Sequence, residues 1–145
     1  MEPATEDLSQ GRIREIYEDF VNCRLDRLSA VFDNDIDFLS HAPTDLFPYL
    51  GRHRGWAEVS KAISQIHEHL EVVYFWPLSI LIDRNNAALT VFVSIRQRSN
   101  GKQADFLAAH FLKFRHGRIV EFCGIIDSLE TVRQLEQRPI KTECN

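Results

Sequence analysis

Apolar side chains near the start of the chain recur with the period of an α-helix. Over residues 10–24 they occupy positions i, i+3, i+4, i+7 and i+8, which form the apolar stripe of an amphipathic helix. The five residues are Ile13, Ile16, Tyr17, Phe20 and Val21. A side-chain oxygen at the helix start can accept from a free backbone N–H, so we expect Ser9 or Asp7 to cap this helix.

Two more helices and a short strand are expected before residue 71. Residues 27–32 predict a short helix capped by Asp26, with an apolar side formed by Leu28, Val31 and Phe32. Over residues 35–41 apolar and polar positions alternate, which predicts a strand that ends at His41. Helical spacing returns over residues 56–70 and predicts the third helix.

From residue 71 onward the pattern changes to four β-rich runs. They are VVYFWPLSILI, AALTVFVSIRQR, ADFLAAHFLKF and RIVEFCGIID, separated by the turn signals DRNN, SNGK and RHG. Asn100-Gly101 is the strongest hairpin signal, because both residues tolerate the positive φ of a two-residue turn. Pro77 cannot donate to a sheet ladder and predicts a bulge or an edge position. Helices followed by antiparallel strands indicate an α+β domain with its helices on one face of the sheet.

Length and charge narrow the possible partners. The 145 residues, 44% of them hydrophobic, show no internal repeat and no linker. We therefore expect one domain over residues 1–145, with a core at about 9–137 and room for a ligand cavity. The formal charge of -4, from 17 basic and 21 acidic residues, gives no basic surface for a polyanion, so no nucleic-acid partner is expected.

Neither a membrane segment nor a metal or cofactor motif is apparent. The N-terminal stretch MEPATEDLSQ lacks the pattern of a signal peptide, and no run approaches the ~18 apolar residues of a membrane span. Cys23, Cys123 and Cys144 cannot all pair within one chain, which favours a reducing, cytoplasmic location. His67 and His69 point to different sides of a helix, and no zinc, Walker or dinucleotide motif occurs, so we expect no metal and no cofactor.

The order of elements and three stretches of sequence resemble the nuclear transport factor 2-like superfamily, in its ketosteroid isomerase and SnoaL-like polyketide cyclase branch. The stretches are IYEDFVNCRLDRLSAVFDNDIDFLSHA, GRHRGWAEVSKAI and GRIVEFCGIIDSLETVRQL. The resemblance covers residues 9–137. It implies a cone-shaped, cystatin-like roll, in which a curved and mostly antiparallel sheet wraps around three N-terminal helices and leaves an apolar cavity. Members include isomerases, cyclases, dehydratases and proteins without catalysis, so the fold alone does not assign a function.

The resemblance also suggests site residues. Ketosteroid isomerases carry a tyrosine on the first helix that hydrogen-bonds the enolate oxygen, and a carboxylate base at the end of the first strand. Tyr17 matches the tyrosine, and His41 occupies the position of the base. A histidine, with a reference pKa of about 6.5, is closer to neutral pH than an unperturbed carboxylate, so His41 is the candidate general base.

Two later residues complete the candidate set. His110 lies in the strand that carries the family's second oxyanion donor, and its neighbours of equal parity are apolar. It is either a core histidine bonded to a backbone carbonyl or a pocket residue. SnoaL-like proteins can carry a base late in the sheet, which makes Asp127 a candidate. Alternation turns Asp127 away from the face of Ile126 unless Gly124 hosts a bulge, and an N-cap role is the simpler interpretation.

These observations lead to two expected functions. The first is a cofactor-independent isomerase, cyclase or dehydratase that acts on a small apolar carbonyl compound in the cone, with Tyr17, His41 and either His110 or Asp127 as catalytic residues. The alternative is a non-catalytic ligand-binding or dimerisation module. In both cases we expect a homodimer formed through the sheet, because superfamily members commonly pair this way and AALTVFVSI is apolar on both faces.

Overall fold

The computed structural model describes residues 8–136, which form four helices and six strands. The helices are α1 (Gln10–Val21), α2 (Leu25–Leu28), α3 (Trp56–His69) and α4 (Ser128–Glu136). The strands are β1 (Phe32–His41), β2 (Arg52–Arg54), β3 (Leu70–Asp83), β4 (Asn86–Gln97), β5 (Gln103–Arg115) and β6 (Arg118–Ile126). The α+β class expected from the sequence is confirmed.

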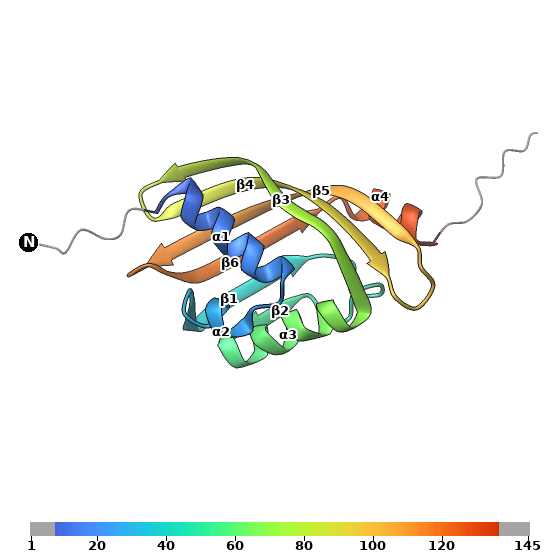
Figure 1. The fold of residues 1–145 in the computed structure, drawn as a ribbon, viewed down its shortest axis with the longest axis horizontal. Coiled ribbons are helices and arrows are strands. Elements are labelled where there is room, and N and C mark those ends of the chain that lie inside the picture. The colour runs from blue at the N-terminus through green and yellow to red at the C-terminus, as the bar shows by residue number, and fades with distance from the viewer. Residues whose placement is uncertain (1–7, 137–145) are drawn as a thin grey trace, which may run out of the picture.

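The strands form one mixed sheet in the order β2-β1-β6-β5-β4-β3. Neighbouring strands are antiparallel except β1 and β6, which run parallel. In Figure 1, α1 crosses one face of the curved sheet, α3 lies beside β1 and β2, and α4 lies near the start of β5. The sheet and the first three helices therefore enclose a common interior, as a cone-shaped roll requires.

The first helix begins as predicted and ends earlier. Ser9 is its N-cap, and the Ser9 hydroxyl accepts from the backbone N–H of Arg12 at 3.1 Å. Asp7, the alternative cap, lies outside the described residues. The helix stops at Val21, three residues before the expected end, and Cys23 takes a positive φ of 52°.

The prediction of a helix over residues 27–32 is wrong. The helix α2 ends at Leu28, Asp26 lies inside its first turn, and Phe32 already begins β1. Phe32 pairs with Ile119 of β6, whose backbone N–H donates to the carbonyl of Val31 at 2.7 Å. Long-range pairing with β6 therefore decides the structure here, although Leu28, Val31 and Phe32 are buried as expected.

Asn100-Gly101 does not form the predicted two-residue turn. Of Asn100 and Gly101, only Gly101 has a positive φ, and they lie in a longer loop between β4 and β5. The two-residue turn with positive φ at both positions is instead His116-Gly117, with φ values of 53° and 76°. Pro77 lies on the edge strand β3 next to a register shift, which confirms its prediction.

One strand was not predicted. The three residues of β2 pair antiparallel with β1. Gly51 and Gly55 flank this short strand with φ values of 102° and 86°, so the chain turns sharply on both sides. Arg52 of β2 lies 3.8 Å from a carboxylate oxygen of Asp37.

Candidate functional site

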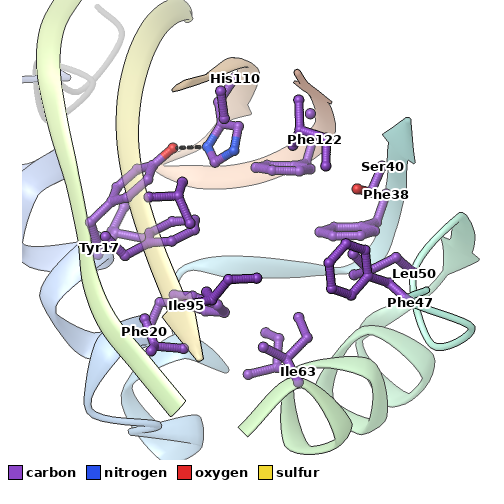
Figure 2. A pocket seen from close by; sticks show the side chains of 18 of the residues that line it. Tyr17, Phe20, Phe38, Ser40, Phe47, Leu50, Ile63, Ile95, His110 and Phe122 are labelled. Atoms are coloured by element: carbon purple, nitrogen blue, oxygen red, sulfur yellow. Dashed lines mark hydrogen bonds between the residues drawn. The ribbon is translucent and has the colours of Figure 1, made fainter. Parts of the chain in front are cut away.

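The inner face of the sheet, α1 and α3 enclose a cavity of about 150 Å³. Its walls are almost entirely aliphatic and aromatic. Among the described residues that line it, the polar side chains are Tyr17, Ser40 and His110, and none carries a formal charge in its usual form at neutral pH. Figure 2 shows Tyr17 and His110 at one side of the cavity and Ser40 at the other. Such a site suits a small neutral molecule.

Tyr17 and His110 form a buried pair at the wall of this cavity. Tyr17 projects inward from α1 and is 5% exposed, and His110 projects inward from β5 and is 6% exposed. The Tyr17 Oη and the His110 Nδ1 lie 2.5 Å apart (Figure 2). Phe75 packs against both rings. Of the two interpretations of His110, the structure shows a cavity-lining residue bonded to a side chain and not to a backbone carbonyl.

Burial keeps this pair uncharged. Removal from water lowers the pKa of His110 to about 3 and raises the pKa of Tyr17 well above its usual value. The hydrogen bond between them can take two forms. Tyr17 can donate to Nδ1 while the His110 Nε2 carries a proton, or Nδ1–H can donate to Tyr17 while Nε2 is a free acceptor. Among the described residues the His110 Nε2 has no hydrogen-bond partner, so it remains available to a ligand.

Gly124 makes room for the rings of Phe122 and His110, which pack closely over it. It is the register partner of His110 on β5 and of Ser40 on β1, so the three residues form one row across the sheet. A Cβ at Gly124 would lie 3.0 Å from the Phe122 Cε1 and 3.4 Å from the His110 Cδ2. The sequence interpretation missed Ser40 and Gly124 as site residues. Their parity with Phe38 and Phe122 could have indicated that they face the interior.

The structure does not bring His41 to Tyr17. Phe38 and Ser40 point into the molecule, so alternation along β1 turns His41 to the outer face of the sheet. Its side chain is exposed, and its register partner Ile125 is 45% exposed. The expectation that Tyr17 and His41 share one cavity is therefore not met, and a general base at His41 has no geometric support in this cavity.

Asp127 has the geometry of a helix cap. The Asp127 Oδ1 accepts from the backbone N–H of Glu130 at 3.2 Å, and the Asp127 carbonyl accepts from that of Thr131 at 3.0 Å. The side chain is exposed and does not line the cavity. The irregularity between β5 and β6 lies at Lys113 and Phe114 and not at Gly124, so no bulge turns Asp127 inward.

Other polar clusters give no second site in the part of the chain that the structure describes. No group of three or more His, Cys, Asp or Glu residues is placed to hold a metal ion within residues 8–136. The His67 Nε2 donates to the carbonyl of Phe20 at 2.8 Å, and the backbone carbonyl of His67 accepts from the Arg98 Nε at 3.1 Å. The His69 ring stacks on Tyr49. Within the same residues, no helix is long and apolar enough to cross a membrane.

Comparisons with known proteins place the fold. No curated protein sequence matches the chain significantly. A solved structure of a proposed isomerase from Rhodopseudomonas palustris is similar, with 21% identity, 95% of this chain and 100% of that chain covered, and a TM-score of 0.79. A nuclear transport factor 2-like protein from Burkholderia xenovorans has 19% identity, coverage of 84% and 91%, and a TM-score of 0.73. An LEH-like epoxide hydrolase of M. tuberculosis has 12% identity, coverage of 90% of both chains, and a TM-score of 0.71.

The family follows from a sequence match as well as from the fold. The model of the SnoaL-like domain matches residues 13–122, which is more than half of the chain and includes Tyr17, Ser40 and His110. With the nuclear transport factor 2-like fold of its solved neighbours, this match shows that the chain belongs to the SnoaL-like domain family.

Proposed function

We propose that the cavity binds a small neutral carbonyl compound whose oxygen lies at the Tyr17–His110 pair, and that this pair moves a proton between the α-carbon and that oxygen. The observation that carries the proposal is the buried Tyr17–His110 hydrogen bond at the wall of an otherwise apolar cavity. A ligand with a net charge would be left without a charged partner there, at a large cost in free energy.

The size of the cavity limits the ligand. Apolar cavities of about 150 Å³ hold a molecule of about the size of benzene. Phe75, Phe122 and Phe38 surround the space with flat aromatic surfaces, and Phe38 and Phe122 stack with ring centroids 4.6 Å apart. These walls favour a compound with one six-membered ring.

A base that became charged would be unfavourable in this cavity. The pKa of His110, about 3, is about four units below a pH of 7, so forming the imidazolium at pH 7 costs about 5 kcal/mol. A relay that keeps both residues neutral avoids this cost. The α-proton moves to the His110 Nε2, the Nδ1 proton moves to the Tyr17 Oη, and the Tyr17 proton moves to the carbonyl oxygen.

Atoms and charge balance in this relay. One C–H bond breaks, one O–H bond forms, and the ketone becomes its enol. The pair ends in the other of its two tautomers, with the proton on Nε2 and Tyr17 donating to Nδ1. When the substrate is an unsaturated ketone that forms a dienol, the relay can run in reverse: the enol O–H proton returns to Tyr17, the Tyr17 proton returns to Nδ1, and the Nε2 proton moves to a different carbon, which completes an isomerisation. The proposal is thus a cofactor-independent keto–enol isomerase activity, one of the chemistries that the fold supports in its relatives.

Exchange of α-protons with solvent tests the proposal. Cyclohexanone and related cyclic ketones in D₂O should gain deuterium at the α-carbon faster with the protein, as read by NMR. Tyr17→Phe and His110→Gln should each slow the exchange by about 100-fold or more, since each removes one proton carrier of the relay. Two matched controls, Tyr74→Phe on the outer face and His69→Gln on an exposed helix position, should retain it.

Two results would contradict parts of the proposal. If exchange survives both Tyr17→Phe and His110→Gln but is lost in His41→Gln, then His41 is the general base, as the resemblance to ketosteroid isomerases implies. If ketones bind and the binding depends on Tyr17, but no α-proton exchanges, then the protein is a ligand-binding module without catalytic activity.

A second proposal concerns the outer face of the sheet. We propose that two copies of the chain pair through this face. It exposes large apolar side chains on three strands, with 45–72% of each accessible: Tyr74, Leu81, Leu107, Phe111 and Ile125. Apolar surface gathered on one face is typical of an interface. Sedimentation velocity at micromolar concentration should show a dimer, and Leu107→Lys should give the monomer. A wild-type chain that sediments as a monomer would contradict the pairing.

A further inference from the structure

The Phe122 ring occupies the space between His110 and Phe38 on the inner face of the sheet (Figure 2). It stacks on the Phe38 ring with centroids 4.6 Å apart, and it meets the His110 ring edge to face at 4.8 Å. Phe122 is half-buried and lines the cavity. The phenyl ring is therefore a wall of the cavity directly beside the imidazole that the proposed relay uses.

Gly124 provides the room in which this ring lies. Its backbone does not have a positive φ, so the conformation itself does not require a glycine there. A Cβ at Gly124 would lie 3.0 Å from the Phe122 Cε1 and 3.3 Å from its Cζ, closer than carbon atoms pack comfortably. Glycine inside a strand otherwise weakens the strand. The missing side chain thus serves the Phe122 ring, which lies against the bare backbone of β6.

The Phe122 ring also blocks one direction in which a ligand could extend. Gly124 pairs in register with His110 on one side and with Ser40 on the other, so the ring that covers Gly124 covers the middle of this row. Figure 2 shows Tyr17 on the other side of His110, away from Phe122. A smaller side chain at position 122 would therefore add space along the sheet toward Ser40 and leave the Tyr17–His110 hydrogen bond in place.

We infer that Phe122, held over Gly124, sets the size limit of the ligand and makes the cavity selective for ketones with a single ring. The inference rests on the proposed function, because it takes the ligand carbonyl to lie at the Tyr17–His110 pair. A second ring fused to the first needs the space that Phe122 occupies. Phe122 is thus a residue that determines specificity and takes no part in proton transfer.

Two ketones that differ by one fused ring test this inference. The dissociation constants of cyclohexanone and trans-2-decalone are measured by NMR titration, and the wild type should bind cyclohexanone more tightly. In Phe122→Ala the affinity for 2-decalone should rise at least tenfold, because burial of two CH₂ groups of the added ring is worth about this factor. Phe122→Leu, which leaves a side chain of intermediate size, should give an intermediate ratio of the two constants. Phe92→Leu, a matched substitution on the outer face, should leave the ratio unchanged.

A second experiment tests the packing of Phe122 on Gly124 without any ligand. In the wild type, Gly124→Ala should lower the urea concentration at the midpoint of unfolding, because the added methyl group displaces the Phe122 ring. In the Phe122→Ala background the ring is absent and alanine suits a strand better than glycine, so Gly124→Ala should leave the midpoint unchanged or raise it. Equal losses in the two backgrounds would contradict the packing on which the inference depends.

The outcomes separate the inference from the proposed function. If cyclohexanone binds in a Tyr17-dependent way, but the Phe122 variants leave the ratio unchanged or weaken both ligands equally, then Phe122 does not set the size limit and the proposed function stands. A wild type that binds both ketones equally well would also overturn the inference. If cyclohexanone does not bind the wild type, and 2-decalone does not bind Phe122→Ala, the proposed function fails and the inference fails with it. Thermal unfolding of each variant shows that it is folded, so a changed ratio reports recognition.

Discussion

The two faces of strand β5 have similar composition and different roles. Leu112, on the inner face, is 3% exposed, whereas its neighbour Phe111, on the outer face, is 47% exposed. His110, like Leu112, points into the cavity, while Leu107 and Ala109 point outward. Hydrophobicity alone therefore does not distinguish the faces. They differ in what covers them, because α1 and α3 close over the inner face and leave room for a ligand.

The largest expected effect separates two adjacent alanines. Ala108 is 5% exposed on the inner face, and Ala109 lies on the outer face. Ala108→Asp would bury a carboxylate without a partner and should lower the free energy of unfolding by about 3–5 kcal/mol. Ala109→Asp should change it by less than about 1 kcal/mol and act on dimer formation instead. Urea unfolding measures the first effect and sedimentation the second. Equal destabilisation by both variants would mean that the faces are not distinct.

The second effect depends on pH and follows from His110. Its pKa of about 3 lies below the unfolded value of about 6.5, so the unfolded chain binds more protons between these values. Its contribution to stability is complete above pH 6.5 and is lost as the pH falls toward 3. Between pH 6.5 and 5 the loss should be about 2 kcal/mol.

Variants isolate the contribution of His110 to that pH dependence. Burial also lowers the pKa of His67, so its contribution has the same sign. The pKa of Glu130 is lowered to about 2, so this residue affects the pH dependence of stability only below about pH 4.5. Urea unfolding between pH 5 and 7 should therefore show a smaller pH dependence in His110→Gln than in His67→Gln. The same slope in His110→Gln and the wild type would contradict a buried neutral His110.

Much of the fold could be predicted from sequence because its signals are local. The apolar stripe of α1, the Ser9 cap and the four long strands depend on neighbours a few residues apart. The errors arise where distant partners decide. Phe32 joins β1 because Ile119 pairs with it, and β2 exists because β1 lies beside it. Ile119 lies tens of residues from Phe32, so a local window of sequence does not include it. The run of residues that forms β2 is too short to give a strand signal of its own.

The candidate site was predicted in part for the same reason. Tyr17 and His110 each lie on an apolar face that periodicity shows, and the structure brings the two together. His41 was chosen because its position relative to Tyr17 matches that of the base in ketosteroid isomerases. In a strand, a difference of one residue moves a side chain to the opposite face, so this match did not decide which way His41 points. Alternation with Phe38 favoured Ser40 as the inward residue. The pairing of Tyr17 with His110 could not be predicted, because 93 residues separate them.

A smaller effect contrasts two tyrosines. Tyr17→Phe removes the partner of the His110 Nδ1 inside the protein and should lower the free energy of unfolding by about 1–2 kcal/mol. Tyr74 is 45% exposed on the outer face, and Tyr74→Phe should change stability by less than about 0.5 kcal/mol. Urea unfolding at pH 7 compares the two. A Tyr17→Phe protein as stable as the wild type would show that the buried hydrogen bond contributes nothing to the inner face.

The smallest expected effect is at His41, the residue that tests the assignment of faces most directly. His41→Ala removes an exposed side chain at the end of β1 and should change the free energy of unfolding by less than about 0.5 kcal/mol. Its neighbour Ser40 lines the cavity, so Ser40→Ala should alter the affinity for cyclohexanone while His41→Ala leaves that affinity unchanged. Because Ile125 beside His41 belongs to the proposed dimer face, any effect of His41→Ala should appear in sedimentation. If ligand titration instead showed a loss in His41→Ala and none in Ser40→Ala, the register of β1 would be shifted by one residue and the two faces exchanged at that strand.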